Sequence, residues 1–201
     1  MTPFSTVQGT AAALPAANID TDVIMPKQFL KGIDRSGLDR GLFHDLRFDA
    51  GGNPRPDFVL NMPAWTDAHF LVVGDNFGCG SSREHAVWGL MQYGIRAVIG
   101  TSFAGIFFDN CARNGLLAIT LPAADVARLM ARAAGPATNV FTVDLARQTI
   151  GAGDVTLHFE IDAVRKEALL QGLDAIGQTL TLRADILAFQ RQHLEAHPWF
   201  R

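Results

Sequence analysis

The stretch from His69 to Leu121, HFLVVGDNFGCGSSREHAVWGLMQYGIRAVIGTSFAGIFFDNCARNGLLAITL, decides the fold of this 201-residue chain. Three short apolar runs in it are typical of buried strands: His69–Val73, Ala97–Ile99 and Leu116–Leu121. Two segments between these runs have helical patterns that end at a glycine: Ser81–Tyr93 and Phe103–Arg113. The order strand–helix–strand–helix–strand predicts a parallel sheet with right-handed crossovers.

The pattern changes after this stretch. Ala123–Ala134 has apolar residues at helical spacing, and two later runs alternate between apolar and polar residues, Phe141–Leu145 and Val155–Ile161. Gly151–Asp154 lies between the two runs and indicates a hairpin, so the expected sheet is mixed. Two further helices are predicted, at Asp162–Gln171 and at about 184–196.

Composition excludes several classes of protein. Seventeen Lys and Arg against twenty Asp and Glu leave a net charge of −3, which argues against nucleic-acid or anionic-membrane binding. No apolar run approaches the roughly 18 residues that span a bilayer, and the N-terminus lacks a signal-peptide pattern, so we expect a cytoplasmic protein. Cys79 and Cys111 are the only cysteines, which excludes a disulfide framework and a four-cysteine iron–sulfur or zinc site.

Gly78–His85, between a strand and a helix, is the best candidate site. Glycines let a ligand approach the backbone, a helix N-terminus favours anions, and the guanidinium of Arg83 suits a carboxylate or phosphate. The spacing matches neither the dinucleotide fingerprint, nor the phosphate loop, nor the serine-hydrolase elbow. A plain alternative stays open, since Ser81 and Glu84 also form a capping-box pattern and His85 is expected to be structural.

Weaker candidates are two acidic residues, a histidine pair and one thiol. Asp20 and Asp22 offer oxygen ligands for a hard cation, although acidic turns are common. His193 and His197 have i, i+4 spacing on a predicted helix but no third ligand nearby. Cys79 is either a reactive thiol in the glycine loop or a packed side chain.

Several motifs, in order along the chain, identify a resemblance. Gly78–Ala86 resembles the GSSREHA signature of the swivelling domain of the aconitase family, and Asn18–Pro26 resembles the family's DTDxIIP segment, with Met25 where isoleucine is usual. Three more segments match the family's SFAxIF, NGLL and GLDxIG motifs: Thr101–Phe107, Asn114–Leu117 and Gly172–Gly177. The last motif is similar to that of bacterial small subunits of 3-isopropylmalate dehydratases. Arg113 stands where this family commonly has asparagine.

The resemblance implies an α/β swivelling β/β/α domain, with a mixed sheet, barrel-like closure and flanking helices. We expect one such domain over residues 1–201, with a helical extension at about 183–201. In this family the small subunit works with a large subunit that carries a [4Fe–4S] cluster, so this chain is expected to hold no cofactor and no metal itself. Together the subunits interconvert 2-isopropylmalate and 3-isopropylmalate through 2-isopropylmaleate, in leucine biosynthesis.

The family's site residues carry over by motif. Ser81 matches the catalytic base, and Ser82 and Arg83 match contacts to a substrate carboxylate. Gln28–Ser36 matches the segment that senses the substrate side chain, where Phe29 and Leu30 suit an isopropyl group. A serine is a poor base unless amides and positive charge stabilise its alkoxide, and we expect the glycine loop, the helix start and Arg83 to supply both.

Three alternatives remain. Related hydro-lyases that act on citraconate, homoaconitate or dimethylmalate share the serine–arginine signature, so the hydroxy-diacid substrate is not decided by it. A non-catalytic anion-binding module could keep the same loop. A phosphate-binding domain is disfavoured by the missing lysine and third glycine.

Overall fold

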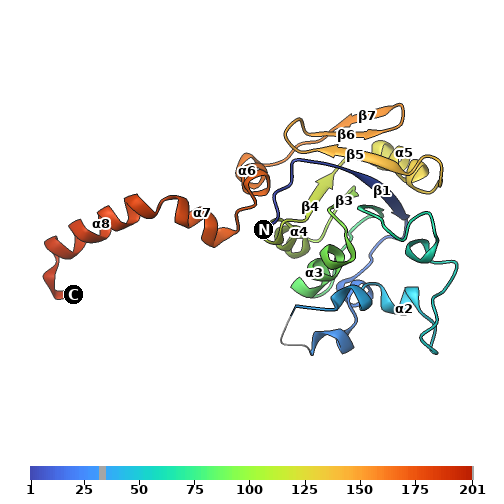
Figure 1. Ribbon diagram of the computed structural model, residues 1–201, viewed down its shortest axis with the longest axis horizontal. Helices are drawn as coiled ribbons and strands as arrows, with labels where there is room; N and C mark the ends of the chain where they lie inside the picture. The colour runs from blue at the N-terminus through green and yellow to red at the C-terminus, as the bar shows by residue number, and fades with distance from the viewer. Residues whose placement is uncertain (32–34, 201) are drawn as a thin grey trace.

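The computed structural model describes residues 1–31 and 35–200 (Figure 1). Strands in this part of the chain form one sheet in the order β4-β3-β2-β1-β5-β6-β7, which curls into a half-barrel with helices packed against it. The strands are β1 Thr6–Leu14, β2 Phe70–Val73, β3 Ala97–Gly100, β4 Leu117–Thr120, β5 Val140–Asp144, β6 Thr149–Ala152 and β7 Val155–His158. The mixed α/β architecture expected from the sequence is confirmed.

The helices are of two kinds. The α-helices are α1 Thr21–Ile24, α2 His44–Arg47, α3 Glu84–Tyr93, α4 Gly105–Asn114, α5 Ala123–Ala133, α6 Ala163–Gln171, α7 Ala175–Thr181 and α8 Arg183–Ala196. Short 3₁₀ helices are η1 Lys27–Leu30, η2 Leu38–Arg40, η3 Val59–Asn61 and η4 Pro198–Phe200. Each helix predicted from the sequence is present, with ends that differ by up to three residues.

The parallel half of the sheet follows the predicted order. β2, β3 and β4 pair in parallel, and β2 also pairs in parallel with β1. Every residue of β2 and β3 is buried, because helices and the other half of the sheet cover both faces. That is why these strands read as continuous apolar runs rather than as alternating ones.

The central strand β1 has no strand-like pattern in the sequence. Its residues, TVQGTAAAL, are rich in alanine, glycine and polar types, which have low β-propensity. It is nevertheless the strand that joins the two halves, parallel to β2 and antiparallel to β5. Small side chains suit this position, since Ala11 and Ala12 are fully buried between packed layers.

The predicted hairpin is wrong in detail. Gly151–Asp154 does not join the two alternating runs, because the short strand β6 lies between them and pairs with both β5 and β7. The turn lies between β6 and β7, where Gly153 has φ +64°. The sequence TIGA of β6 has too few apolar residues to show alternation. The sequence pattern therefore predicts one hairpin where the structure has a meander of three strands, β5, β6 and β7.

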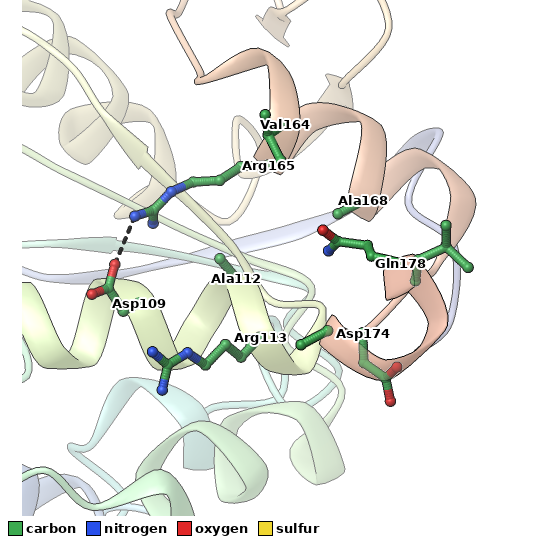
Figure 2. Close-up of a pocket in the computed structure, with 10 residues that line it drawn as sticks. Asp109, Ala112, Arg113, Val164, Arg165, Ala168, Asp174 and Gln178 are labelled. Atoms are coloured by element: carbon green, nitrogen blue, oxygen red, sulfur yellow. Dashed lines mark hydrogen bonds and ion pairs between the residues drawn. The ribbon is translucent and has the colours of Figure 1, made fainter. Parts of the chain in front are cut away.

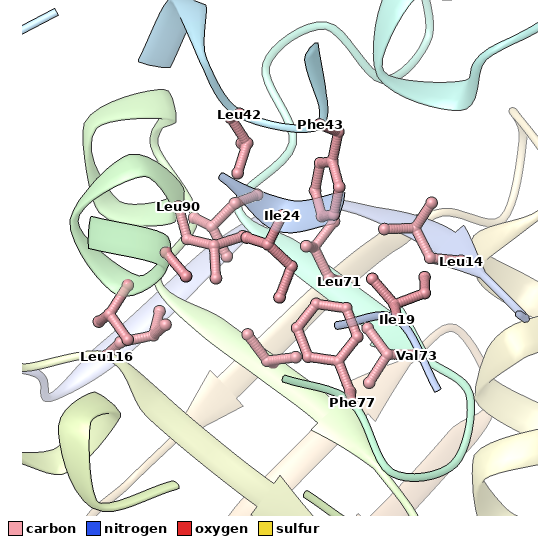
Figure 3. Close-up of a cluster of buried hydrophobic side chains, with 14 of the residues drawn as sticks. Leu14, Ile19, Ile24, Leu42, Phe43, Leu71, Val73, Phe77, Leu90 and Leu116 are labelled. Atoms are coloured by element: carbon pink, nitrogen blue, oxygen red, sulfur yellow. The ribbon is translucent and has the colours of Figure 1, made fainter. Parts of the chain in front are cut away.

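The sheet separates two apolar clusters. Leu71 and Val73 of β2 point into the cluster covered by α3, α1 and the 38–65 region (Figure 3), whereas Phe70 and Val72 point into the cluster covered by α5 and the meander. This division follows from the alternation of side chains along a strand. The first cluster lies directly beneath the glycine loop, because Ile19 and Phe77 from the loops belong to it.

The C-terminal helices leave this body. α7 and α8 extend as an arm away from the sheet (Figure 1). None of the helices in the described ranges has the length and apolar character needed to cross a membrane. The assignment of residues 1–201 to a single domain with a helical extension stays a prediction.

Candidate active site

The glycine loop lies where three parallel strands end. The loop follows β2, and its backbone bonds to the segments that follow the two neighbouring strands: the amide of Gly78 donates to the carbonyl of Ile19 (2.8 Å), and that of Phe77 donates to the carbonyl of Ser102 (3.3 Å). The segment around Ile19 follows β1, and Ser102 follows β3. Carboxyl ends of parallel strands are the usual location of ligand sites in α/β sheets.

Gly78 is required by both its conformation and its surroundings. Its φ is +75°, in the left-handed region, and a Cβ atom on it would lie 2.2 Å from Cγ of Phe107. Any side chain here would push the loop off α4, so the glycine sets how closely the loop packs on this helix.

Thr21 holds the backbone of Ser81. Its buried hydroxyl donates to the carbonyl oxygen of Ser81 (3.0 Å) and accepts from the amide of the same residue (3.1 Å). The amide of Thr21 also donates to the carbonyl of Cys79 (2.8 Å). Ser81 itself is exposed, so its side chain is presented to solvent on a backbone that is fixed from below.

Arg83 pairs with the second aspartate of the DTD motif. A guanidinium nitrogen of Arg83 bonds to a carboxylate oxygen of Asp22, and the arginine side chain is only 15% exposed while that of the aspartate is 45% exposed. Asp20 caps α1 by accepting from the amide of Val23 (2.8 Å). The two aspartates therefore have separate structural partners, one in an ion pair and one in a helix cap.

The expected capping box is also wrong. α3 begins at Glu84, not at Ser81, and its N-cap residue is Arg83, which makes no side-chain capping bond. Glu84 instead accepts a hydrogen bond from the side-chain amide of Asn114 (2.7 Å), whose carbonyl accepts from the indole of Trp88 (2.8 Å). The local sequence around Ser81 and Glu84 does not predict this arrangement, because Asn114 lies in α4, thirty residues further along the chain.

Two of the backbone amides that were expected to stabilise the Ser81 alkoxide donate hydrogen bonds to other groups. The amide of Ser81 bonds to Thr21, and the amide of Arg83 bonds back to the carbonyl of Ser81 (2.8 Å). Because α3 starts at Glu84, Ser81 precedes the helix instead of capping it. The positive charge nearest in sequence is Arg83.

The remaining predicted site residues lie on the loop itself and on η1. Ser82 is exposed beside Ser81, as a substrate contact requires. Phe29 and Leu30, on η1, are partly buried against the first apolar cluster, and the ring of Phe29 lies 4.9 Å from that of His44. Residues 32–34 of the predicted side-chain segment Gln28–Ser36 lie outside the described residues. His85 packs its ring 4.6 Å from that of Trp88, in keeping with a structural role.

The described residues hold no cluster of metal-binding side chains. No three His, Cys, Asp or Glu residues in ranges 1–31 and 35–200 come together in a way that suits an ion. His193 and His197 stack with a centroid distance of 4.5 Å on the arm. Cys79 is partly exposed, whereas Cys111 is fully buried, and burial raises the pKa of its thiol well above the usual value.

Sequence reasoning missed two residues of this site. Thr21 lies inside the DTD motif, but only the flanking aspartates were considered as functional. The role of Asn114 depends on the packing of α4 against α3. The available signal was the threonine at the centre of the DTD segment and the asparagine that opens the NGLL segment.

Comparison with known proteins finds relatives that are similar to this chain in sequence and in fold. A family model described as the aconitase C-terminal domain matches residues 1–124, and one described as LeuD_N matches residues 127–163. The 3-isopropylmalate dehydratase small subunit 1 of Mannheimia succiniciproducens is 54% identical and covers 100% of both chains. The 3-isopropylmalate dehydratase small subunit of Jannaschia sp. is 55% identical over 99% of this chain and 100% of its own. A crystal structure of 3-isopropylmalate dehydratase from Methanocaldococcus jannaschii superposes with a TM-score of 0.65, at 25% identity, over 92% of this chain and 99% of that one.

Proposed function

This chain belongs to the family of 3-isopropylmalate dehydratase small subunits, within the aconitase-type hydro-lyases, and we propose that it supplies the base-bearing half of such an enzyme's active site. Its reaction is the interconversion of 2-isopropylmalate and 3-isopropylmalate through 2-isopropylmaleate, a step of leucine biosynthesis. A cytoplasmic location stays a prediction.

One observation carries the assignment of roles. Ser81 is exposed while its backbone is held at both the amide and the carbonyl by the buried hydroxyl of Thr21. A fixed backbone with an accessible side chain is what a positioned catalytic group needs, because small displacements of such a group cost large factors in rate.

The proton transfer is proposed to take place at the Ser81 side chain. In the forward direction its Oγ accepts a proton from C3 of 2-isopropylmalate, the electron pair of that C–H bond forms the double bond, and hydroxide leaves from C2. Water then adds in the opposite sense, so that C2 receives a proton and C3 receives the hydroxyl. A nearby cation favours the alkoxide form of the base, and Arg83 is the candidate on this chain.

Arg83 and Ser82 are proposed to hold a substrate carboxylate. The pairing with Asp22 uses one guanidinium nitrogen, NH1. Arginine presents five donors in a planar fork, so the side chain can keep its bond to Asp22 while it binds a carboxylate. The small exposed fraction of Arg83 means that its orientation is set before the substrate arrives.

The other half of the site is proposed to come from a large subunit. The described residues of this chain do not fit an iron–sulfur cluster, since they bring no three suitable ligands together. The Lewis acid that assists departure of hydroxide is expected from a [4Fe–4S] cluster held by that partner. Docking of the partner would cover Ser81 and exclude water from the site.

The substrate side chain is proposed to lie near Phe29 and Leu30. Both side chains are apolar and partly buried on η1, which follows α1 and the DTD motif in the chain. Related acids such as citraconate, homoaconitate and dimethylmalate differ at this side chain, so this region would discriminate among them.

The test is turnover by the complex with an iron-loaded large subunit. Ser81→Ala should lower kcat by about 10²–10⁴-fold, the usual contribution of a positioned base, with the KM for 2-isopropylmalate little changed. Ser5→Ala, at another exposed serine, is the matched control and should turn over like the unaltered chain. Alkene absorbance is followed with 2-isopropylmalate, citrate and citraconate in parallel. Near-normal turnover by Ser81→Ala would show that Ser81 is not the base. Turnover of another acid, with none of 2-isopropylmalate, would show that the proposed substrate is wrong.

A further inference from the structure

Most exposed apolar side chains of the described residues gather on one segment. Of the twelve large apolar side chains exposed there, eight lie in residues 175–200, which we call the arm. Phe189 is 68% exposed and Trp199 is 72% exposed. Figure 1 shows the arm extending away from the sheet, so these side chains do not serve the core of this chain. A concentration of exposed apolar side chains on one segment is typical of an interaction site.

α8 carries the apolar residues in two rows. One row follows helical spacing i, i+4, i+7: Leu182, which precedes α8 directly, Ile186 and Phe189, with the ring of His193 next along the same line. A second row has Leu187 and Leu194, and at about 100° of rotation per residue the two rows lie about 120° apart, with Arg183 and Gln190 between them. The opposite side is polar or small: Asp185, Ala188, Arg191, Gln192 and Glu195. α8 thus keeps two apolar rows on one half of its surface although it stands clear of the body.

The end of the arm is organised without a partner. The ring of His193 stacks on that of Phe189 and on that of Phe200, with centroid distances of 5.7 Å in both cases. These contacts fold η4 back onto the end of α8. Less side-chain freedom is therefore lost when this surface is covered, which favours binding.

The root of the arm is tied to the body. The N-terminal amine donates to the carbonyl of Gly172 (2.9 Å), and Arg165 of α6 pairs with Asp109 of α4 (2.6 Å). Figure 2 shows this pair beside a hollow that is also lined by Asp174, directly before the arm, and by Gln178 of α7. α4 also packs against α3, the helix that follows Ser81. The arm thus starts from the same layer of helices that supports the candidate active site.

We propose that the apolar face of α8 docks into an apolar groove of the large subunit, and this rests on the function proposed above. A stable hetero-complex of this kind buries about 2,000 Å² or more of largely apolar surface. Beside the glycine loop Ser81 and Ser82 are polar, and Ile106 is the large apolar side chain that is exposed there. Eight such side chains are exposed on the arm, which is therefore the richer source of apolar surface.

Two other occupants fit the arm less well. Two-stranded pairing with a second copy needs one narrow seam, whereas the two rows of α8 are too far apart for a single seam. A groove that contacts the helix on two sides accommodates both rows. Anionic membranes favour helices rich in lysine and arginine, but α8 has two arginines, two acidic residues and no lysine.

The experiment compares two double variants of the full chain with equal charge. Ile186→Glu with Phe189→Glu alters the apolar face, and Ala188→Glu with Gln192→Glu adds the same charge on the opposite side. All four positions are exposed, so both variants should keep the Tm of the body. Binding to the iron-loaded large subunit is measured by titration, with dehydration of 2-isopropylmalate followed in the same mixtures.

We expect the face variant to raise the Kd at least about 100-fold, as loss of two central apolar contacts does, and the control to stay within about threefold. At saturating large subunit the face variant should recover kcat, because Ser81 is intact. Equal Kd values for the face variant and the control would overturn the docking proposal, and so would failure of the unaltered chain to bind the large subunit. Loss of self-association, or of binding to anionic vesicles, in the face variant alone would overturn it as well. A complex that forms normally but turns over none of the acids would instead overturn the proposed function and leave the docking intact.

Discussion

The hydroxyl of Thr21 lies 3.0 Å from the carbonyl oxygen of Ser81 and 3.1 Å from its amide nitrogen, so one side chain satisfies both backbone groups of a residue sixty positions away. Thr21 opens α1 and is buried, whereas Ser81 is exposed at the end of the glycine loop. The contact joins the two most conspicuous motifs of the sequence and makes the position of the serine depend on the DTD segment.

Removal of that hydroxyl should damage the site without changing its shape. Thr21→Val leaves the partly buried amide of Ser81 without a partner and leaves its carbonyl with the amide of Arg83 alone, which costs about 1–3 kcal/mol in the free energy of unfolding. We also expect kcat of the reconstituted enzyme to fall, since the Ser81 backbone is no longer held. Urea unfolding and turnover measure the two effects. Thr21→Ser keeps the oxygen and should restore both, and a Thr21→Val chain with full turnover would contradict this positioning role.

Arg83→Lys tests whether the fork of the guanidinium is needed. A lysine keeps the charge near Asp22 but cannot bind a carboxylate with two parallel donors. Loss of one charged hydrogen bond, at about 1.5–3 kcal/mol, predicts a KM for 2-isopropylmalate about 10- to 100-fold higher, with a smaller change in kcat. Arg128→Lys, on an exposed ion pair of α5, is the control and should leave KM unchanged. A kcat loss at constant KM would instead assign Arg83 to the chemical step.

The two cysteines should differ in reactivity. Burial raises the pKa of the Cys111 thiol, so the thiolate that reacts with iodoacetamide is scarce there and is also shielded. Cys79 is partly exposed, two residues before Ser81. We expect mass spectrometry to find label on Cys79 in the native chain, on Cys111 only after unfolding, and reduced label on Cys79 once the large subunit is bound. Rapid native labelling of Cys111 would contradict the packing of α4.

The single tyrosine gives a direct test of the 38–65 region. Burial raises the pKa of Tyr93 above its usual value of about 10, although nearby Arg47 opposes this shift. The phenol oxygen lies 3.0 Å from the carbonyl oxygens of both Leu60 and Thr66, and its one hydrogen is shared between these two acceptors. Tyrosinate absorbance should therefore appear at higher pH in the native chain than in denaturant.

The same shift affects stability. The pKa of Tyr93 is higher in the folded chain than in the unfolded chain. The protonated phenol therefore contributes fully to the free energy of unfolding below the unfolded pKa of about 10, and this contribution is lost as the pH rises through the folded pKa. Tyr93→Phe should be less sensitive to pH in this alkaline window. Identical titrations in the native and denatured chains would show that the phenol is not buried.

Prediction from sequence succeeded where a signal is local. β2 and β3 are short runs of buried apolar residues next to glycine, and α3 and α4 end at glycines in the left-handed conformation, so their order and parallel pairing followed. It failed at β1 and β6, whose residues are small or polar. Such strands exist because their neighbours complete their hydrogen bonding, which no window of sequence can reveal.

The candidate site divides in the same way. Residue types alone identify a glycine loop between a strand and a helix, and the resemblance to the GSSREHA motif singles out Ser81, Ser82 and Arg83, whose roles stay predictions. The capping box was wrong, since Glu84 had a better partner in Asn114 from another helix. At Asp20 and Asp22 the sequence favours an ordinary acidic turn over a cation site, but it does not reveal that Asp22 lies beside Arg83.

By itself, then, the order of residues determined the element sequence of the parallel half, the family, and which side chains are candidates for the chemistry. Only the folded chain decided that β1 joins the two halves of the sheet, that Thr21 holds Ser81, that Asp22 pairs with Arg83 and that α8 stands clear of the body. The physical reason is range: helix periodicity and turn chemistry act over a few residues, whereas these contacts join segments whose approach depends on the pairing of the whole sheet.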